Sequence, residues 1–320
     1  MAEREAVLAA VRREGLFSRD RPVLAMISGG RDSTCLLDVA VEQRGAAMVG
    51  ALHVNYGLRA EADADERHCR ELCARLGVPI DVLRAETPAA AGNLQAWARD
   101  VRYGEALRLA EQRDALIAAG HTASDQAETI LYRLAASPGR RALLGMAPSD
   151  GRLIRPLLGV TREQTEAYCR ERGLDWREDA SNEDERFART RVRHGLLEAL
   201  RAVHPAAQEN VLRTAALLRD EAALLDELVG QEASRGEIST ARLAELSPAL
   251  ARLVVVRLAE DAAGTYVPQA GARVDELLAL ARRGGHAELH VGGGAGAVLD
   301  GGVLRMVRLP ARAGVEGDGD

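Results

Sequence analysis

The first 120 residues alternate between short apolar runs and longer amphipathic segments, and this alternation restricts the fold more than any other feature of the chain. The apolar runs are residues 22–27, 46–54, 79–83 and 115–119. The segments with helical periodicity between them are 33–44, 62–76 and 94–112. Strand, helix, strand, helix is the order of a parallel sheet with helices on both faces, and a continuous apolar run such as VLAMI suits a strand buried on both sides. The sequence therefore predicts an α/β fold built on a doubly wound parallel sheet.

Helical patterns dominate after about residue 122. The expected helices are 124–135, 162–172, 192–202, 206–229, 240–261 and 269–283. Near the end, AELHV and AVLDGGVLRMV read as short strands with a hairpin turn at Asp300-Gly301. The glycine run 292–297 lacks the spacing of a dinucleotide-binding motif, so a loop or hairpin is expected there. We expect two domains, 1–200 and 201–320, with the boundary between 200 and 239: a catalytic domain, then a helical region leading to a small α+β domain.

Composition restricts the cellular setting. Hydrophobic residues make up 47% of the 320, which is enough for a sizeable core. No apolar run approaches the ~20 residues that cross a membrane, and the charged N-terminus does not resemble a signal peptide, so a cytoplasmic protein without membrane contact is expected. The four cysteines contain no C-x-x-C pair. Cys69 and Cys73 lie one helical turn apart beside His68, but ordinary helix residues in a reducing compartment are favoured over a metal site.

Polar clusters follow three of the predicted strands. Residues 28–33 (SGGRDS) follow the first, His53 and Asn55 end the second, and residues 120–126 (GHTASDQ) follow the fourth. Ligands of open parallel sheets bind beyond the carboxyl ends of the strands. These clusters are therefore expected to converge on one crevice.

The first cluster suits an anion. Its glycines allow backbone N–H groups to face a phosphate, and Ser33 is expected to open a helix whose dipole points the same way. Ser28 and Ser33 add hydroxyl donors. The chain contains no lysine, which excludes a Walker-type loop. An ordinary strand-to-helix turn with a capping serine remains the alternative.

The last cluster combines a histidine with acids. Asp125 lies four residues after His121, and Glu128 follows within the next turn. Acids in the first turn of a helix are favoured by the helix dipole, which is one explanation. The other is that Asp32 and Asp125 hold Mg²⁺ against a nucleotide triphosphate, while His121 binds phosphate or polarises a reacting oxygen.

Longer motifs resemble a known family. ISGGRDST looks like the pyrophosphate loop of the N-type ATP pyrophosphatases. HVNYGLR, GNLQAWARDVRY, GHTASDQAET and LIRPLL follow in the order and approximate spacing of the tRNA(Ile)-lysidine synthetase family, between residues 23 and 194. The resemblance implies that ATP adenylates the wobble cytidine of a tRNA(Ile) with anticodon CAU, releasing pyrophosphate. The amine of free L-lysine then displaces AMP to give lysidine.

The resemblance also implies roles for individual residues. Its catalytic positions are Asp32, Arg102, His121 and Asp125, of which Asp32 and Asp125 are the Mg²⁺ ligands. The positions that match its ATP loop are Ser28, Gly29, Gly30, Asp32 and Ser33. Arg31, at the variable position of that motif, and His53 and Asn55, at the second strand end, are also expected to bind ATP. Arg99, Gln126 and Glu128 match nearby motif positions and are expected to bind substrate. Arg189, Arg191 and Arg193 are also expected to bind substrate, because they lie in an arginine-rich segment. Residues that depart from the family pattern are Tyr56, Gly120, Ser124, Ala136 and Thr190.

A protein that binds tRNA should have a local excess of positive charge. The chain carries a net charge of −6, yet its segment 186–219 contains seven arginines against Glu198 and Glu209. Such a local basic patch suits phosphate contacts, although a solvated helix in an arginine-rich protein would look the same. Two other functions stay open: a cytidine thiolase, which usually needs paired cysteines, and a non-catalytic homologue that binds nucleotide or tRNA. The small domain within 201–320 is expected to contact the body of the tRNA. A homodimer is also left open.

Overall fold

The computed structural model describes residues 2–18, 20–58, 60–86, 93–136, 139–178, 188–233 and 235–310. The chain divides into two compact units, Met1–Leu218 and Arg219–Asp320. The division falls inside helix α10 (Ala207–Glu232). The expected domain boundary near residue 200 therefore stays a prediction.

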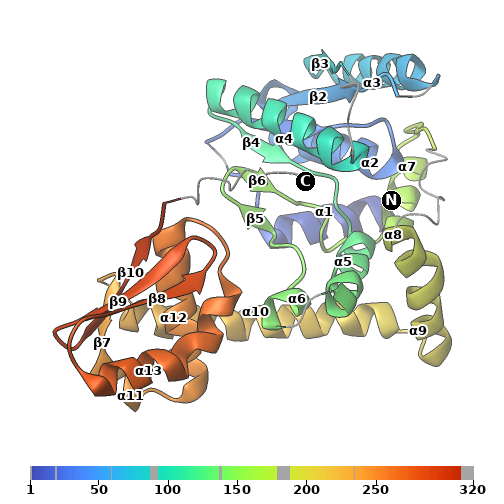
Figure 1. The fold of residues 1–320 in the computed structure, drawn as a ribbon. Helices are drawn as coiled ribbons and strands as arrows, with labels where there is room; N and C mark the ends of the chain where they lie inside the picture. Colours follow the sequence, from blue (N-terminus) through green and yellow to red (C-terminus); the bar gives the residue numbers. More distant parts are fainter. Residues whose placement is uncertain are drawn as a thin grey trace, which may run out of the picture. The chain divides into compact units, whose positions relative to one another are not determined.

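The first unit contains a six-stranded sheet with the order β3-β2-β1-β4-β6-β5 (Figure 1). Its strands are β1 (Val23–Met26), β2 (Val49–Asn55), β3 (Ile80–Arg84), β4 (Leu116–Ala118), β5 (Ser149–Asp150) and β6 (Leu153–Ile154). All neighbours pair in parallel except β5, which runs antiparallel to β6 at the edge. The predicted parallel sheet is confirmed. The sequence did not indicate β5 and β6, because two residues carry no periodic pattern.

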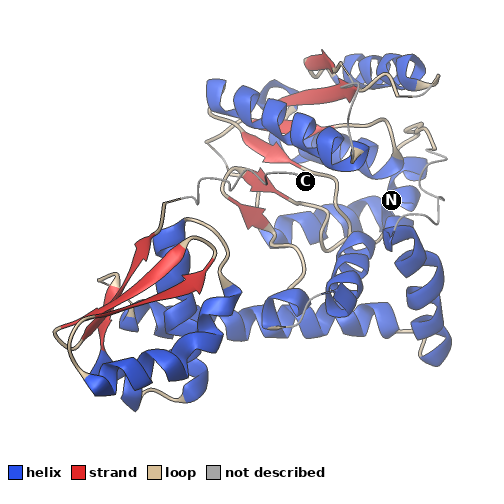
Figure 2. Ribbon diagram, in the orientation of Figure 1, coloured by secondary structure: helices blue, strands red, loops and turns tan. Residues whose placement is uncertain are grey.

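Helices cover both faces of this sheet (Figure 2). The described helices that lie wholly in this unit are α1 (Ala2–Glu14), α2 (Arg31–Arg44), α3 (Ala62–Leu76), α4 (Leu94–Gln112), α5 (Ala123–Ala136), α6 (Arg140–Leu143), α7 (Arg162–Glu171), α8 (Ala188–Arg191) and α9 (Glu198–Val203). Of these, α1, α2, α3 and α7 pack on one face of the sheet and α4 on the other. Alternate residues of β1 enter opposite cores: Val23 and Ala25 pack with α1, α2 and α7, whereas Leu24 and Met26 pack with α4. This two-sided burial explains why VLAMI shows no polar alternation.

Several predicted boundaries were wrong. Helix α2 begins at Arg31 with Gly30 as its N-cap, so Ser33 lies inside the first turn and does not open the helix. Residues Ala46–Met48 form the 3-10 turn η1 in front of β2. The helix predicted at 192–202 begins with the π-helical segment η3 (Val192–Leu197) and continues as α9. A π turn keeps the spacing of apolar residues close to helical, so periodicity alone does not detect it.

The second unit has a four-stranded antiparallel sheet, β7-β10-β9-β8, packed against helices. Its elements are β7 (Glu237–Ser239), α11 (Thr240–Glu245), α12 (Pro248–Ala263), the 3-10 helix η4 (Pro268–Arg273), α13 (Val274–Arg283), β8 (Ala287–Gly292), β9 (Ala295–Asp300) and β10 (Val303–Arg308). The small α+β architecture is confirmed. The single helix predicted at 240–261 is two, because Ser247 caps α12 and proline occupies its first turn.

Two hairpin turns in this sheet depend on paired glycines. Gly293 and Gly294 join β8 to β9, and Gly301 and Gly302 join β9 to β10. All four have φ between 57° and 79°, as a two-residue hairpin with positive φ at both positions requires. Asp300 pairs with Val303 in the ladder, so the turn is Gly301-Gly302, not the predicted Asp300-Gly301.

Within the described ranges, no helix has both the length and the apolar character needed to span a bilayer.

Candidate nucleotide-binding site

The strand order reverses between β1 and β4, which is where parallel sheets bind ligands. The chain leaves β1 toward β2 and β3 on one side, while β4 lies on the other side. The segments after β1 and β4 touch: a Cβ on Gly120 would lie 3.2 Å from the carbonyl oxygen of Asp32 and 3.3 Å from the backbone nitrogen of Ser33. The tertiary structure thus brings the first and third polar clusters together.

The loop after β1 is held by its own hydroxyl groups. The Ser33 hydroxyl donates to the Gly30 carbonyl at 2.8 Å and accepts from the Ser28 N–H at 3.1 Å. The Ser28 Oγ lies 3.2 Å from the Ser33 Oγ and accepts from the Gly30 N–H at 3.4 Å. From outside, the backbone N–H of Arg177 donates to the Gly29 carbonyl at 2.9 Å. The loop is therefore preorganised from both sides.

The start of α2 suits an anion. No side chain caps the helix at Gly30 among the described residues. Gly29 has a φ of 83°, and a Cβ there would lie 3.4 Å from Cys69 Sγ and from His68 Cδ2. Glycine thus allows both the turn and the close packing on α3. The first-turn N–H groups and the helix dipole remain to face a negative group.

Asp32 lies in this first turn and accepts a hydrogen bond from the Thr165 hydroxyl. Its carboxylate is also 3.4 Å from Arg31 Nε and 3.7 Å from Arg162 Nε. Burial raises the pKa of Asp32 above its ordinary value, against the opposing effects of the Thr165 hydrogen bond and the two arginines. The charge of Asp125 adds to the rise in pKa, and both carboxylates face the guanidinium group of Arg162.

Asp125 is held more tightly. Its Oδ2 accepts from the backbone N–H and the hydroxyl of Thr122, at 2.8 and 2.9 Å, and its Oδ1 accepts from Arg162 Nη2 at 2.7 Å. Burial would raise the pKa of this carboxyl, but Arg162 and the Thr122 bonds outweigh burial and lower it. Asp125 is therefore ionised at neutral pH.

His121 is half-buried beside three arginines. Burial lowers the pKa of His121 to about 4; Arg155, Arg189 and Arg102 act in the same direction and Asp125 against them. The ring is therefore neutral at pH 7. Its Nδ1 is buried and has no hydrogen-bond partner among the described residues, as is also true of Nε in Arg102 and in Arg155. Unpaired buried polar atoms are costly, so these groups suit a polar ligand with oxygen acceptors.

Gln126 and Glu128 were predicted to bind substrate, but both side chains already have partners within the protein. Gln126 makes two hydrogen bonds to the backbone of Met146, at 2.7 and 2.9 Å, and is 2% exposed. Glu128 accepts from Arg193 Nε at 2.6 Å and from Arg162 Nη1 at 3.2 Å. In this structure both side chains hold other parts of the site in place.

His53 and Asn55, at the end of β2, make hydrogen bonds within the protein. The Nδ1 of His53 lies 3.1 Å from the Ile27 carbonyl, while its Nε2 is buried with no partner in the described part of the chain. Asn55 donates to Asp63 and to Glu66 of α3, both at 3.1 Å. His53 therefore keeps one ring atom for a ligand, whereas the Asn55 amide nitrogen is engaged.

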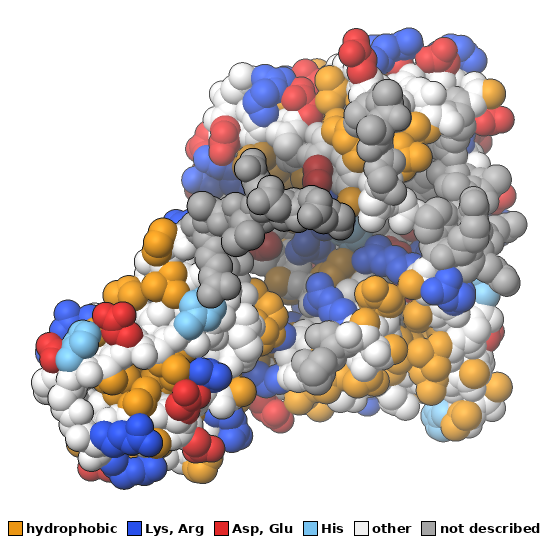
Figure 3. Space-filling view, viewed as in Figure 1, with side chains coloured by type: hydrophobic (Ala, Val, Ile, Leu, Met, Phe, Trp, Pro, Cys, Tyr) orange, Lys and Arg blue, Asp and Glu red, His pale blue; other side chains and the backbone are white. Residues whose placement is uncertain are grey.

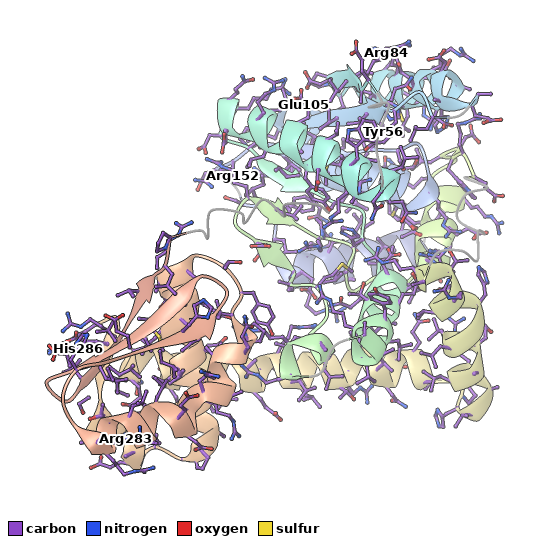
Figure 4. All side chains as sticks on the ribbon, in the orientation of Figure 1. Tyr56, Arg84, Glu105, Arg152, Arg283 and His286 are labelled. Carbon is purple, nitrogen blue, oxygen red and sulfur yellow. The ribbon has the colours of Figure 1, made fainter. Side chains whose placement is uncertain are left out.

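Helix α4 places two of the predicted arginines against an aromatic ring. The guanidinium carbons of Arg99 and Arg102 lie 4.5 and 5.5 Å from the ring centroid of Tyr103. Tyr56 points from the end of β2 toward this helix (Figure 4), and its hydroxyl donates to the Ala98 carbonyl at 2.9 Å. Tyr56, which departs from the family pattern, thus links β2 to α4.

The predicted basic patch is smaller than its sequence suggested. Arg193 is paired with Glu128 inside the site, and Arg201 and Arg213 pair with Glu198 and Glu209 at 2.6 and 2.9 Å. Arg189 and Arg191 are exposed, and Arg189 lies 3.5 Å from Thr129 of α5. Arg186 lies outside the described residues. Arginine and acidic side chains are interspersed over the visible surface (Figure 3).

Sequence reasoning missed Arg162, which contacts three acids of the site: Asp32, Asp125 and Glu128. It is the first residue of α7, after the capping residue Thr161. The helix dipole favours acidic residues at that end of a helix. The unfavourable arginine was therefore the one signal in the sequence that this position has a role other than stabilising the helix.

The four cysteines are buried and free. Burial raises the pKa of Cys69 and of Cys73 to about 12, so neither is a thiolate at neutral pH. Among the described residues, no group of three or more histidine, cysteine or acidic side chains gathers as a metal site.

Comparison with known proteins agrees with this geometry. A family model described as a PP-loop domain matches residues 4–200. The tRNA(Ile)-lysidine synthase of Pseudomonas fluorescens (strain Pf0-1) is 42% identical over 208 residues, 63% of this chain and 47% of the relative. That of Solibacter usitatus is 40% identical over 264 residues, 78% of this chain and 59% of the relative. The chain thus spans about half the length of these curated relatives.

One solved structure supports the fold alone. The U34-tRNA thiolase NcsA from Methanococcus maripaludis, with its [4Fe-4S] cluster, has a TM-score of 0.57 and 16% sequence identity, covering 67% of this chain and 78% of that one. Since the family model spans well over half of the chain and includes the loop after β1, the chain belongs to the PP-loop family.

Proposed function

We propose that this protein ligates lysine to the wobble cytidine of a tRNA(Ile) with anticodon CAU, through an adenylated cytidine, and releases pyrophosphate and AMP. The observation that carries the proposal is the junction of the PP-loop, after β1, with the His121 and Asp125 segment, after β4. The curated relatives that match the chain are named tRNA(Ile)-lysidine synthases, which supports the choice of substrate.

ATP is proposed to bind with its departing pyrophosphate on the loop after β1. The proposed donors are the backbone N–H groups of Gly29 and of the first turn of α2. Ser28 and Ser33 hold the loop in shape, since the Gly30 N–H donates to Ser28 and the Ser33 hydroxyl donates to the Gly30 carbonyl. Arg31 is engaged elsewhere, because its Nη1 pairs with Glu166 at 2.8 Å. His53, whose Nε2 has no partner among the described residues, is placed near the nucleoside.

Mg²⁺ would be held by Asp32 and Asp125. Both offer carboxylate oxygens, which Mg²⁺ prefers, and the repulsion between them is the condition that a bound cation relieves. Two protein ligands leave the remaining positions to phosphate oxygens and water, as is usual for this ion. When bound, the cation would neutralise charge on the phosphates of ATP.

The acceptor side of the site is proposed to be the group around His121. Neutral His121 accepts or donates one hydrogen bond without adding charge, while Arg102, Arg155 and Arg189 supply preorganised cations for an α-phosphate that gains charge during transfer. Arg99 and Arg191 extend the positive groups toward the tRNA, whereas Arg193 is engaged by Glu128. Lysine is proposed to approach Asp125 with its amine.

The protein is placed in the cytoplasm, where its tRNA is found. Exposed apolar side chains on α5, η3 and α9, namely Tyr132, Leu134, Leu196 and Val203, are a surface that a second copy could cover. A homodimer is proposed on that ground.

Thiolation of the cytidine is the less supported alternative. Sulfur transfer by the related fold uses cysteines or a cluster, whereas the cysteines here are buried and spread over α2, α3 and α7. The two on α3, Cys69 and Cys73, are also protonated at neutral pH, since burial raises the pKa of each. An iron–sulfur cluster in freshly purified protein would support thiolation instead.

The test is to incubate the protein with ATP, Mg²⁺, labelled lysine and either tRNA(Ile) or tRNA(Met), both with anticodon CAU. Label should appear on the wobble base of tRNA(Ile) only. Asp32→Ala and Asp125→Ala should each lower product formation at least a hundredfold while tRNA binding survives, and Asp81→Ala, which removes a surface ion pair with Arg113, should change little. ATP turnover without tRNA, or full activity in both site variants, would contradict the proposal.

A further inference from the structure

We propose that Arg162 is the positioning residue of this site: its one guanidinium group aligns the acid of the PP-loop with the two acids of α5. Its positive charge also neutralises the acids before Mg²⁺ binds together with the nucleotide. The inference rests on the proposed function only for the identity of that metal. The alignment itself depends on the contacts of Arg162 alone.

Each nitrogen of the guanidinium group faces a different carboxylate. Nη2 lies 2.7 Å from Asp125 Oδ1, and Nη1 lies 3.2 Å from Glu128 Oε1. The third nitrogen, Nε, lies 3.7 Å from Asp32 Oδ2. Arginine presents its donors in a rigid planar fork, so one side chain can set the spacing of three acids. Asp32 belongs to α2 and the other two acids to α5, so Arg162 joins two separate helices.

The backbone of Arg162 is fixed as well. Thr161 and Gln164 form a complete capping box at the start of α7. The N–H of Arg162 donates to the Ser124 hydroxyl of α5 at 3.3 Å. One turn later the Thr165 hydroxyl donates to Asp32. The first turn of α7 is thus anchored to both helices whose acids the guanidinium group joins.

Helix stability does not explain this arginine. A positive side chain at the first position of a helix opposes the helix dipole, which favours acids there. The acids around Arg162 offset that effect, so the arginine and the acids depend on one another. The side chain of Arg162 is 20% exposed, those of Asp32 and Asp125 are 23% and 18% exposed, and that of Glu128 is 2% exposed. Water and ions can therefore reach the Asp32 and Asp125 side of the cluster.

A consequence for metal binding follows from Coulomb's law. A cation between Asp32 and Asp125 has the positive guanidinium group as its neighbour, which weakens the binding of a free divalent ion. A cation that carries a polyphosphate brings negative charge for the guanidinium group and is not disfavoured in this way. Arg162 therefore makes the acids select metal bound to nucleotide over free metal.

The experiment measures binding of Mn²⁺, as a paramagnetic substitute for Mg²⁺, by electron paramagnetic resonance without nucleotide, lysine or tRNA. In Arg162→Gln, free Mn²⁺ should bind on the order of tenfold more tightly, because one neighbouring positive charge is lost. At the same time kcat should fall at least tenfold with a smaller change in KM for ATP, and guanidinium ion added to the buffer should restore part of kcat. Arg170→Gln is the matched control on the same helix, since Arg170 is 69% exposed and pairs at the surface with Glu166.

Arg162→Lys separates charge from geometry. Its ammonium group keeps the positive charge, so Mn²⁺ binding should stay as weak as in the parent protein, but a single ammonium cannot align three carboxylates and kcat should still fall. Unchanged Mn²⁺ affinity in a folded Arg162→Gln protein would overturn the proposal, as would full activity in Arg162→Lys. Because Mn²⁺ binding needs neither lysine nor tRNA, an error in the proposed reaction would leave that measurement intact.

Discussion

His121 shows how one residue obtains its chemistry from its surroundings. The same imidazole in water would be partly charged near pH 6.5. Here burial, then the neighbouring arginines, keep it neutral at every pH above about 4. The adjacent Asp125 stays charged because Arg162 and Thr122 outweigh its burial. A neutral base beside a fixed anion is an arrangement suited to handling an amine or a nucleotide base at neutral pH.

The depressed pKa of His121 predicts a pH dependence of stability. Between pH 6.5 and 4 the unfolded chain binds a proton at this residue that the folded protein does not, so stability falls as the pH is lowered through this window. His121→Gln should lose less stability over that window, by on the order of 1–2 kcal/mol. Urea unfolding at pH 7, 6 and 5 measures the difference. His286→Gln, at an exposed site in the second unit, should keep the parent slope. Parallel slopes in His121→Gln and the parent would show that the surroundings of His121 do not lower its pKa.

At the scale of elements, the site depends on how α7 begins. Its capping box places Arg162 and Thr165 over the acids that follow β1 and β4. The helix itself was predictable from periodicity. Its contact with α5 was not, because Ser124 and Arg162 are 38 residues apart and no local pattern links them.

Removing the Thr161 cap should weaken ATP binding as well as lower the stability of the protein. Thr161→Ala should destabilise the protein by about 1 kcal/mol, the usual effect of a lost N-cap, and should also weaken ATP binding severalfold by releasing Arg162. Ser239→Ala is the matched control, since Ser239 caps α11 in the second unit through a 3.1 Å bond. It should lose similar stability and bind ATP normally. Calorimetric titration with ATP and urea unfolding measure both effects, and equal ATP affinity in the two variants would exclude the role of the cap.

At the scale of the whole molecule, two units with separate cores share one chain. The first has a core on each face of its parallel sheet. The second buries one face of its antiparallel sheet against α12 and α13. The residues assigned to ATP, metal and reaction all lie in the first unit.

Damage to the second core should therefore spare nucleotide binding. Leu258 is 2% exposed inside that core, and Leu258→Ala should cost about 2–5 kcal/mol through the cavity it leaves. Scanning calorimetry should show the second unit unfolding at least about 10 °C earlier, with ATP affinity unchanged below that transition and tRNA affinity reduced. Loss of ATP binding in step with the second unit would show that the two units unfold together.

The parallel sheet, the loop after its first strand and the candidate acids and histidine could all be predicted from the sequence. These follow from local rules: apolar periodicity, glycine conformation and the position of strand ends. Which of these candidates lie together, and which already have partners, depends on how the chain folds. In the folded protein, Gln126 is hydrogen-bonded to Met146 and Arg193 is paired with Glu128. Arg162 contacts three acids, Asp32, Asp125 and Glu128. Such pairings depend on strand order and helix packing across long separations in the chain, and they are set by the balance of burial and charge in three dimensions, which no short stretch of sequence contains.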